Sequence, residues 1–366
     1  MFVYLSLILI APLVYVIFRK KEYVEKLALG VTCLVVFLLL ALRSKDSGVD
    51  LVAYYDMYEV MKQYSFMEVL KDFKFLSKNT LLTVEWGYAL FTWVFSKSGL
   101  PFQALLIVQS AFCVFSIYHF ISKHSVKPSL GIVIIIGFGL VDYVYCIVRQ
   151  AISVAILLFC ADFAEKKQLP ICVLLTFVAT LFHESAIAFL VAIPLSLLPI
   201  NWWTSLIFIG LSLLLIPGFN LLNEPVFAKV MEALSKGGYL SEGFEFGELI
   251  VVLLAIALFC TFFFAKKKEV SRANQLCFWA FMLTLPFQSF SMYMPIFGRL
   301  LTLTLMPFAS VAITNCFLEK DKELSKVEIA LEIAIFVAVV AYYGYCLYSD
   351  KRELCLVPYK LFFVVE

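Results

Sequence analysis

The stretch FGLVDYVYCIVRQAISVAILLFCADF, residues 138–163, is almost continuously apolar and carries one guanidinium group, that of Arg149, near its middle. An arginine side chain stays charged in proteins, and hydrocarbon solvates a charge poorly. The run is therefore better divided in two than taken as one membrane helix. We expect VDYVYCIV to end one helix and turn, so that Arg149 lies at the start of the next helix, at the edge of the membrane.

The rest of the chain has the composition of a membrane protein. Hydrophobic residues make up 63% of its 366 positions and charged residues 15%. Apolar runs of about 17–20 residues, the length that crosses a bilayer core of roughly 30 Å, recur from end to end. The sequence therefore predicts an all-α polytopic membrane protein, a single integral-membrane domain over 1–366 with about twelve crossings. The expected crossings are 2–18, 26–42, 101–121, 129–141, 149–165, 168–182, 185–199, 203–217, 248–265, 273–290, 299–317 and 327–347.

Neither the start of the chain nor its cysteines change this interpretation. The run 2–18 ends in Arg19-Lys20-Lys21 rather than in small residues, which favours a first membrane helix over a cleaved signal peptide. The ten cysteines are scattered and form no Cys-x-x-Cys pair, so they are expected to be buried small hydrophobic residues rather than metal ligands or disulfides.

Positive charge predicts which loops face the cytosol. With the crossings above, all the basic clusters fall on one side and both termini on the other. Residues 85–97 are apolar but short, and counting them as a crossing would break this pattern. We therefore expect them to form a re-entrant or interfacial helix on the outer face, where protein buries it. The basic clusters are 19–26, 123–127, 166–167, 266–272 and 320–326.

Two long segments are then placed on the outer side. Residues 43–100 form an outer-face loop with short interfacial helices. Residues 218–247 contain charged side chains, asparagines and paired glycines. This second segment is either a mobile lid over a site or a plain connector.

Arginines from three distant parts of the chain share this outer edge, namely Arg43, Arg149 and Arg299. Cations are disfavoured at a helix N-terminus, which indicates a nearby anion. For Arg149 the alternatives are an ion pair with Asp142, a phosphate of a ligand, and snorkelling to lipid headgroups. Guanidinium groups give paired, charge-assisted hydrogen bonds to diphosphate oxygens, so the three arginines together predict an anion site.

Acidic side chains and a histidine lie at the same edge. If residues 50–58 are helical, Asp50, Tyr54 and Tyr58 share one face, although Asp50 would serve equally as a helix cap. Glu85 opens the short apolar segment, either as a cap or as a general base. His183 lies between two apolar runs and is either a general base or a hydrogen-bonding group between helices.

Taken in order, these pieces resemble the EpsG family of exopolysaccharide polymerases, which share a role with the Wzy polymerases. The resemblance spans most of the chain and leaves residues 190–290 without a matching motif. The matching motifs are Arg43-x4-Gly48-x-Asp50-x3-Tyr54-x3-Tyr58, Glu85-x-Gly87-Tyr88, Arg149-Gln150, His183-x-Ser185-Ala186, Arg299 and Pro358-Tyr359.

The resemblance implies a bacterial plasma-membrane glycosyltransferase similar to the GT-C class. It would join oligosaccharide repeat units carried on undecaprenyl diphosphate into exopolysaccharide, capsule or O-antigen, on the periplasmic or exterior face. Arg149, Arg299 and Arg43 would then bind the diphosphate. The acceptor hydroxyl would meet His183, Glu85 or Asp50, and the sugar would contact Tyr54, Tyr58, Trp86, Gln150 and Asp142.

The expected partners are the lipid-linked donor and acceptor, membrane lipid and, as an optional regulator, a chain-length protein; nucleic acid is not expected. No metal or other cofactor is expected, because three guanidinium groups would face the diphosphate. Asp50, Glu85 and Asp142 form no recognised magnesium motif. The alternatives are an O-antigen-ligase-like transferase, a flippase or transporter, which would place its charges near the midplane, and a membrane-bound acyltransferase built on His183.

Overall fold

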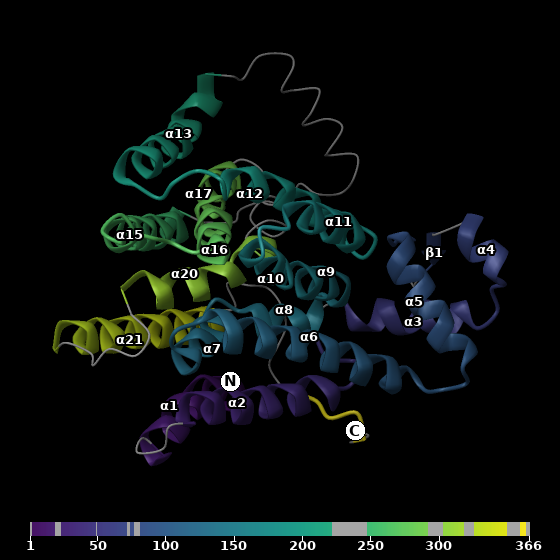
Figure 1. Cartoon of the computed structure of the whole chain (residues 1–366). Coiled ribbons are helices and arrows are strands. Elements are labelled where there is room, and N and C mark those ends of the chain that lie inside the picture. The colour runs from purple at the N-terminus through teal and green to yellow at the C-terminus, as the bar shows by residue number, and fades with distance from the viewer. Residues whose placement is uncertain are drawn as a thin grey trace.

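The structure is a computed structural model of the whole chain. It describes residues 2–18, 23–48, 50–71, 74–76, 81–221, 247–291, 303–317, 326–349 and 359–363. Nearly all of these residues are helical (Figure 1). Within the same ranges, strand occurs as one antiparallel pair, β1 (Lys74–Leu76) and β2 (Leu81–Thr83). The all-α prediction is confirmed in this coarse form.

Every expected crossing coincides with a helix or with two helices in succession. The first half of the chain forms α1 (Phe2–Phe18), α2 (Val24–Ala41), α3 (Leu51–Met61), α4 (Phe66–Lys71), α5 (Trp86–Lys97), α6 (Phe102–His124), α7 (Pro128–Gly137), α8 (Leu140–Cys146), α9 (Val148–Leu158) and α10 (Cys160–Glu165). The second half forms α11 (Leu169–Thr180), the 3₁₀ helix η1 (Glu184–Ala188), α12 (Phe189–Leu195), α13 (Trp202–Leu221), α15 (Gly247–Phe264), α16 (Arg272–Met282), α17 (Thr284–Ser291), α19 (Leu303–Leu305), α20 (Pro307–Phe317) and α21 (Lys326–Ser349).

Several expected crossings are broken into two pieces. The run 129–141 divides at Gly139, whose φ of 84° is left-handed, and α7 and α8 meet at 54°. By length and composition, three described helices are long and apolar enough to cross a membrane, or four if this bent pair counts as one crossing. The three are α2, α6 and α21. The larger number, about twelve, stays a prediction.

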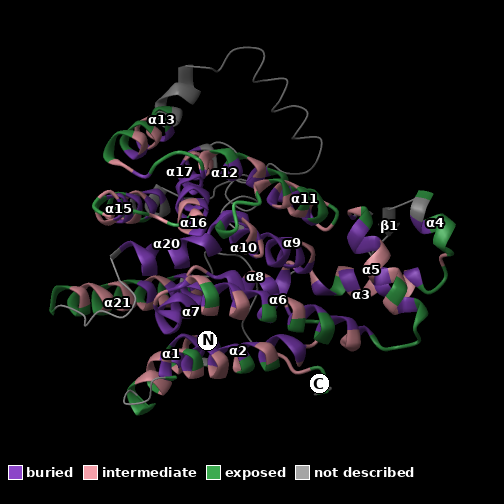
Figure 2. Cartoon of the chain, in the orientation of Figure 1, coloured by how far each residue is buried: buried purple, intermediate pink, exposed green. Residues whose placement is uncertain are grey.

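The centre of the bundle is formed by helices that are buried along most of their length. All ten residues of α7 are buried, and α16 and α20 are buried along most of their described length (Figure 2). A helix that is hydrophobic all round belongs inside a protein or a membrane. By contrast, α13 and α21 expose large apolar side chains such as Ile207, Leu211 and Ile333, as expected for lipid-facing surfaces.

The basic loops that the sequence assigned to one side meet at one end of the bundle. The contacts that join them come from segments far apart in the chain, which supports their placement on a common face. These contacts are Ser129 N–H to Glu25, Lys127 to Glu332, Lys123 to Asp162, and Ala273 N–H to Glu165.

The segment 85–97 is the short helix α5. Its 12 residues extend about 18 Å at 1.5 Å per residue, well short of a bilayer core. The helix packs against α3 and α4, and the Trp93 indole donates to the Tyr64 carbonyl at 2.9 Å. In Figure 1, α3, α4, α5 and β1 lie together beside the main bundle. The proposed lid, 218–247, falls mostly on residues 222–246, which lie outside the described part of the chain.

Candidate functional site

Arg149 occupies the first turn of α9 and is held by side chains from two other helical segments. The backbone leaves helical geometry at Ile147, so α9 begins just before the arginine, as the sequence predicted. Residues 140–146 form the helix α8, however, so the prediction of a turn over VDYVYCIV is wrong. Nη1 of Arg149 lies 2.6 Å from Oε2 of Glu85, and Nε donates to the Tyr54 hydroxyl at 3.1 Å. The partly buried guanidinium therefore has a carboxylate partner, and this partner is Glu85.

Glu85 connects three elements. It precedes α5, yet its side chain makes no capping hydrogen bond to that helix. Instead Oε2 meets Arg149, and Oε1 accepts the backbone N–H of Glu184 at 3.2 Å. The capping alternative for Glu85 is thus not what the structure shows, because both oxygens serve contacts to other elements.

A close backbone approach fixes where Glu85 lies. The N–H of Gly87 donates to the Leu181 carbonyl at 2.7 Å. A Cβ atom at Gly87 would lie only 2.7 Å from the same carbonyl oxygen. Only glycine therefore lets the start of α5 contact the turn that leads to η1 without displacing one of them.

Next to Arg149, three polar side chains form a buried network. The amide Nε2 of Gln150 donates to Ser185 Oγ at 3.2 Å and to Thr304 Oγ1 at 3.4 Å, and the two hydroxyls lie 3.2 Å apart. Ser185 Oγ also lies 2.8 Å from Nδ1 of His183. Amide and hydroxyl groups of this kind are suited to hydrogen-bonding sugar hydroxyls at the inner wall of a site.

His183 is buried and is held in one tautomer. Its Nδ1 accepts the backbone N–H of Ser185 at 3.2 Å, which assigns the proton of the neutral ring to Nε2. Burial lowers the pKa of His183 to about 4; the charge of Glu85 acts to raise it and that of Arg149 to lower it. At neutral pH the ring is therefore uncharged and offers its Nε2 proton as a donor, while Nδ1 is already occupied by Ser185.

Asp142 and Arg43 lie in surroundings of their own. The carboxylate of Asp142 is buried and accepts the Tyr343 hydroxyl at 2.9 Å. Arg43 is fully buried, donates to Ser110 Oγ at 3.1 Å and stacks at 5.6 Å from the ring centroid of Tyr145. Among the described residues its Nε and Nη2 have no hydrogen-bond partner.

Tyr88 lies within electrostatic range of both arginines. Burial raises the pKa of Tyr88, while the positive charges of Arg149 and Arg43 oppose that rise. The two guanidinium groups thus act on one phenol without sharing a hydrogen-bond partner. The third arginine, Arg299, lies outside the described residues, so convergence of all three stays a prediction.

Asp50, Tyr58 and Trp86, also expected at the site, lie in different surroundings. Burial raises the pKa of Tyr54, Arg149 opposes it, and the charges of Asp50 and Glu85 add to it, so Asp50 is electrostatically part of the site. The Asp50 side chain makes no capping bond to α3. Tyr58 is buried and donates to backbone carbonyls, including that of Phe95 at 3.2 Å, whereas Trp86 is exposed.

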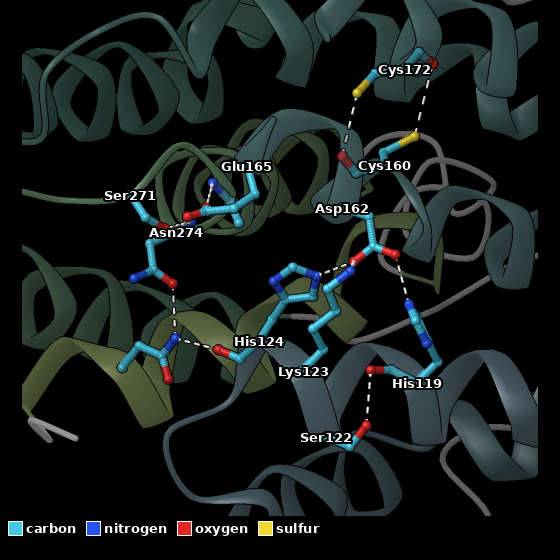
Figure 3. Close-up of polar contacts among 12 residues, drawn as sticks. His119, Ser122, Lys123, His124, Cys160, Asp162, Glu165, Cys172, Ser271 and Asn274 are labelled. Atoms are coloured by element: carbon cyan, nitrogen blue, oxygen red, sulfur yellow. Dashed lines mark hydrogen bonds and ion pairs between the residues drawn. The ribbon is translucent and has the colours of Figure 1, made fainter. Parts of the chain in front are cut away.

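The opposite end of the bundle carries a different charged cluster (Figure 3). Asp162 of α10 faces three side chains of α6, with His119 and His124 nitrogens at 2.6 Å and Lys123 Nζ at 2.8 Å. Asn315 of α20 donates to the His124 carbonyl at 2.6 Å and to Asn274 at 2.8 Å. These contacts join α6, α10, α16 and α20.

A family model now matches nearly the whole chain, over residues 26–361, and its description is the EpsG family. The chain belongs to the EpsG family. No curated protein and no solved structure matches it. The resemblance noted in the sequence is confirmed, and the chain is a helical membrane protein of that family.

In this EpsG-family protein, the structure adds residues that the sequence did not single out as site residues. Ser185 was quoted within a motif and Thr304 within an apolar run, and neither was assigned a role. The available signal for Ser185 was its place two residues after His183. Within the described ranges, no group of three or more histidine, cysteine, aspartate or glutamate side chains is arranged to hold a metal ion.

Proposed function

We propose that this protein is a glycosyltransferase that polymerises oligosaccharide repeat units carried on undecaprenyl diphosphate. The observation that carries the proposal is the Arg149–Glu85 pair beside the Gln150, Ser185 and Thr304 network. It brings a guanidinium, a carboxylate and polar groups able to hydrogen-bond sugar hydroxyls close together, which supports the proposal. Membership of the EpsG family supports the same chemistry.

Arg149 is the proposed ligand of the lipid diphosphate. When the glycosidic bond to the diphosphate breaks, negative charge develops on the leaving oxygen, and a preorganised cation stabilises it. The guanidinium fork matches phosphate oxygens, and the Tyr54 contact at 3.1 Å fixes its orientation. Arg299 is the proposed second phosphate ligand. Arg43, being buried elsewhere, contributes positive potential at Tyr88.

Glu85 is the proposed general base. In the structure its Oε2 accepts a hydrogen bond from Nη1 of Arg149 at 2.6 Å. When a diphosphate oxygen takes the place of Glu85 at the guanidinium, Oε2 of Glu85 is released and accepts the proton of the acceptor hydroxyl. The acceptor oxygen then bonds to the anomeric carbon, the bond from that carbon to the diphosphate oxygen breaks, and the negative charge leaves with the lipid diphosphate. Donor binding and activation of the base are thereby coupled.

His183 and the Gln150 network are proposed to orient the sugars. The neutral imidazole offers its Nε2 proton to a sugar or phosphate oxygen, while Ser185 holds Nδ1. Asp50 lies near Tyr54 and is the alternative acceptor of a sugar proton. The reaction as proposed uses no metal ion. Its partners are the lipid-linked donor and acceptor, with a chain-length regulator as an optional third.

The site end of the bundle is proposed to face the periplasm or cell exterior of a bacterial plasma membrane. The support is charge: the opposite end gathers the basic loops that mark the cytosolic side. Water is excluded from the site by the burial of Ser185, Gln150 and Thr304. Such exclusion protects a lipid-linked donor from hydrolysis.

The test is to incubate the purified full-length protein, in lipid vesicles, with an undecaprenyl-diphosphate-linked oligosaccharide. A ladder of products that differ by one repeat is expected, and Glu85→Gln is expected to lose it while still binding the donor. Transfer of a single unit to another acceptor would indicate a ligase. Unchanged donor that appears on the other side of the vesicle would indicate a transporter and refute the proposal.

A further inference from the structure

A pocket of about 680 Å³ lies close to the Arg149 site and shares α3 with it. The volume is within the range of small-molecule sites. Its walls are the turn after α2, residue Tyr55 of α3, the start of α6, and the C-terminal segment 359–362. In Figure 1 this last segment runs beside the end of α2.

The wall that the C-terminal segment supplies is fixed by backbone pairing. The Ser44 N–H donates to the Lys360 carbonyl at 2.8 Å, and the Phe362 N–H donates to the Leu42 carbonyl at 3.0 Å. The Tyr359 hydroxyl donates to the Leu39 carbonyl at 2.9 Å. Because three hydrogen bonds hold this segment to the end of α2, the pocket is formed before any ligand binds.

The lining combines aromatic rings with an excess of positive charge. Lys45 and Lys360 carry two positive charges and Asp46 one negative charge. The Lys45 ammonium lies 3.9 Å from the ring centroid of Tyr55, whose ring meets that of Phe102 edge-on at 5.5 Å. A lining that combines aromatic rings with two lysines suits a ligand that has apolar faces and carboxylates, as acidic sugars do.

The helix α3 connects this pocket to the reacting groups. Tyr54 lies on one face of α3, and its hydroxyl accepts the Nε–H of Arg149 at 3.1 Å. The next residue, Tyr55, lines the pocket. Neighbouring residues of α3 thus contact Arg149 and line the pocket, which connects the two places through one helix.

We propose that the pocket binds acidic sugar residues of the polysaccharide chain and so holds the growing polymer next to the site. This inference rests on the proposed function and deepens it by naming a charged acceptor. The lysines bind the carboxylates, and the rings of Tyr55 and Phe102 cover the apolar sugar faces. A neutral glycan lacks the charge that this lining recognises.

The experiment measures saccharide binding without catalysis. Full-length protein in phosphatidylcholine nanodiscs is titrated with hexagalacturonate, an acidic probe, and with maltohexaose, a neutral one. The acidic probe is expected to bind at least about tenfold more tightly, and added salt is expected to weaken it. Lys45→Ala and Lys360→Ala are each expected to reduce its affinity about two- to fivefold. Lys62→Ala, an exposed lysine at the other end of α3, is the matched control and leaves binding unchanged.

The outcomes separate this inference from the proposed function. Arg149→Ala is expected to keep hexagalacturonate binding, because that probe lacks a diphosphate. Equal binding of both saccharides, or binding indifferent to Lys45 and Lys360, overturns the inference even if the protein polymerises its substrate. Loss of hexagalacturonate binding in nanodiscs that contain phosphatidylglycerol would instead assign the pocket to a lipid headgroup.

Discussion

The two ends of the bundle use charged side chains in opposite ways. At one end a cation, Arg149, is met by groups from α3 and the start of α5, and its carboxylate partner also binds the turn before η1. At the other end an anion, Asp162, is met by two histidines and a lysine that all lie on α6. In the first arrangement, segments far apart in the chain meet at one cation. In the second, one carboxylate of α10 contacts three side chains of α6, so the contacts join these two helices.

The difference indicates at which end a ligand could form favourable new contacts. Asp162 is satisfied by protein groups on a single helix, so its cluster is complete as a structural link. Arg149 is bound to a carboxylate that a diphosphate can replace with more negative charge and a better fork geometry. If this interpretation is correct, substitutions at Arg149 change the reaction rate and substitutions at Asp162 change stability.

The largest expected effect is that of Arg149→Ala on polymerisation. Loss of a preorganised cation facing the leaving group is expected to lower the rate about 10²- to 10³-fold, as removal of one stabilising donor does in other enzymes. The measurement is the rate of ladder formation per folded molecule in vesicles. Arg149→Lys keeps the positive charge but loses the paired guanidinium N–H groups, so its polymerisation rate is expected to lie between those of the wild type and Arg149→Ala.

The matched control for that variant is Arg272→Ala. Arg272 lies at the opposite end, where its Nη1 donates to the Ser196 carbonyl at 3.0 Å and to Gln275 at 2.8 Å. The same group is removed, so a similar loss of rate in both variants would show a general effect on folding and contradict the comparison. Normal polymer from Arg149→Ala would refute the phosphate role outright.

A smaller effect, on stability, is expected for Asp162→Asn. The amide keeps the shape but loses the charge that binds Lys123 and the two histidines, which is worth about 1–3 kcal/mol for charge-assisted hydrogen bonds. The measurement is the melting temperature in detergent, which is expected to fall, together with the rate per folded molecule, which is expected to stay. A rate loss as large as that of Arg149→Ala would place chemistry at this end too.

The smallest effect concerns pH and His183. Its folded-state pKa of about 4 lies below the ordinary value, so the unfolded chain binds the proton more readily. The stability contributed by the neutral ring is complete above about pH 6.5 and is lost as the pH falls toward 4. In His183→Gln the side chain still has a hydrogen-bond acceptor and a donor, but it does not bind a proton between pH 7.5 and 4.5.

The melting temperature is therefore measured for both proteins from pH 7.5 to 4.5. The wild type is expected to lose more stability than His183→Gln over this range. Parallel curves would show that the imidazole is not a neutral buried group. A rate profile of the wild type that titrates near pH 6.5 would restore His183 as a candidate base.

The helices could be predicted because the length of an apolar run is a local property that the bilayer dictates. The run 26–42 became α2 and 101–121 became α6 with shifts of a few residues at their ends. The break at Gly139 was not predicted, because a glycine in an apolar run is compatible with either a straight or a bent helix. Its left-handed backbone is a consequence of packing.

The site could be predicted only in part, for a related reason. A cation at a helix start called for an anion, and the structure supplies one. Asp142 is nearer in sequence, but α8 directs it toward Tyr343 of α21, and the actual partner, Glu85, comes from a different segment. Which of two carboxylates reaches Arg149 depends on how α5 packs, and a single sequence carries no signal of that packing.

The glycine at position 87 has a mechanical consequence. Because its Cα hydrogens rest against the Leu181 carbonyl, the first turn of α5 and the turn before η1 touch with no side chain between them. This backbone contact joins the segment that carries Glu85 to the segment that carries His183. A substrate that shifts one of these segments is therefore expected to reposition the other.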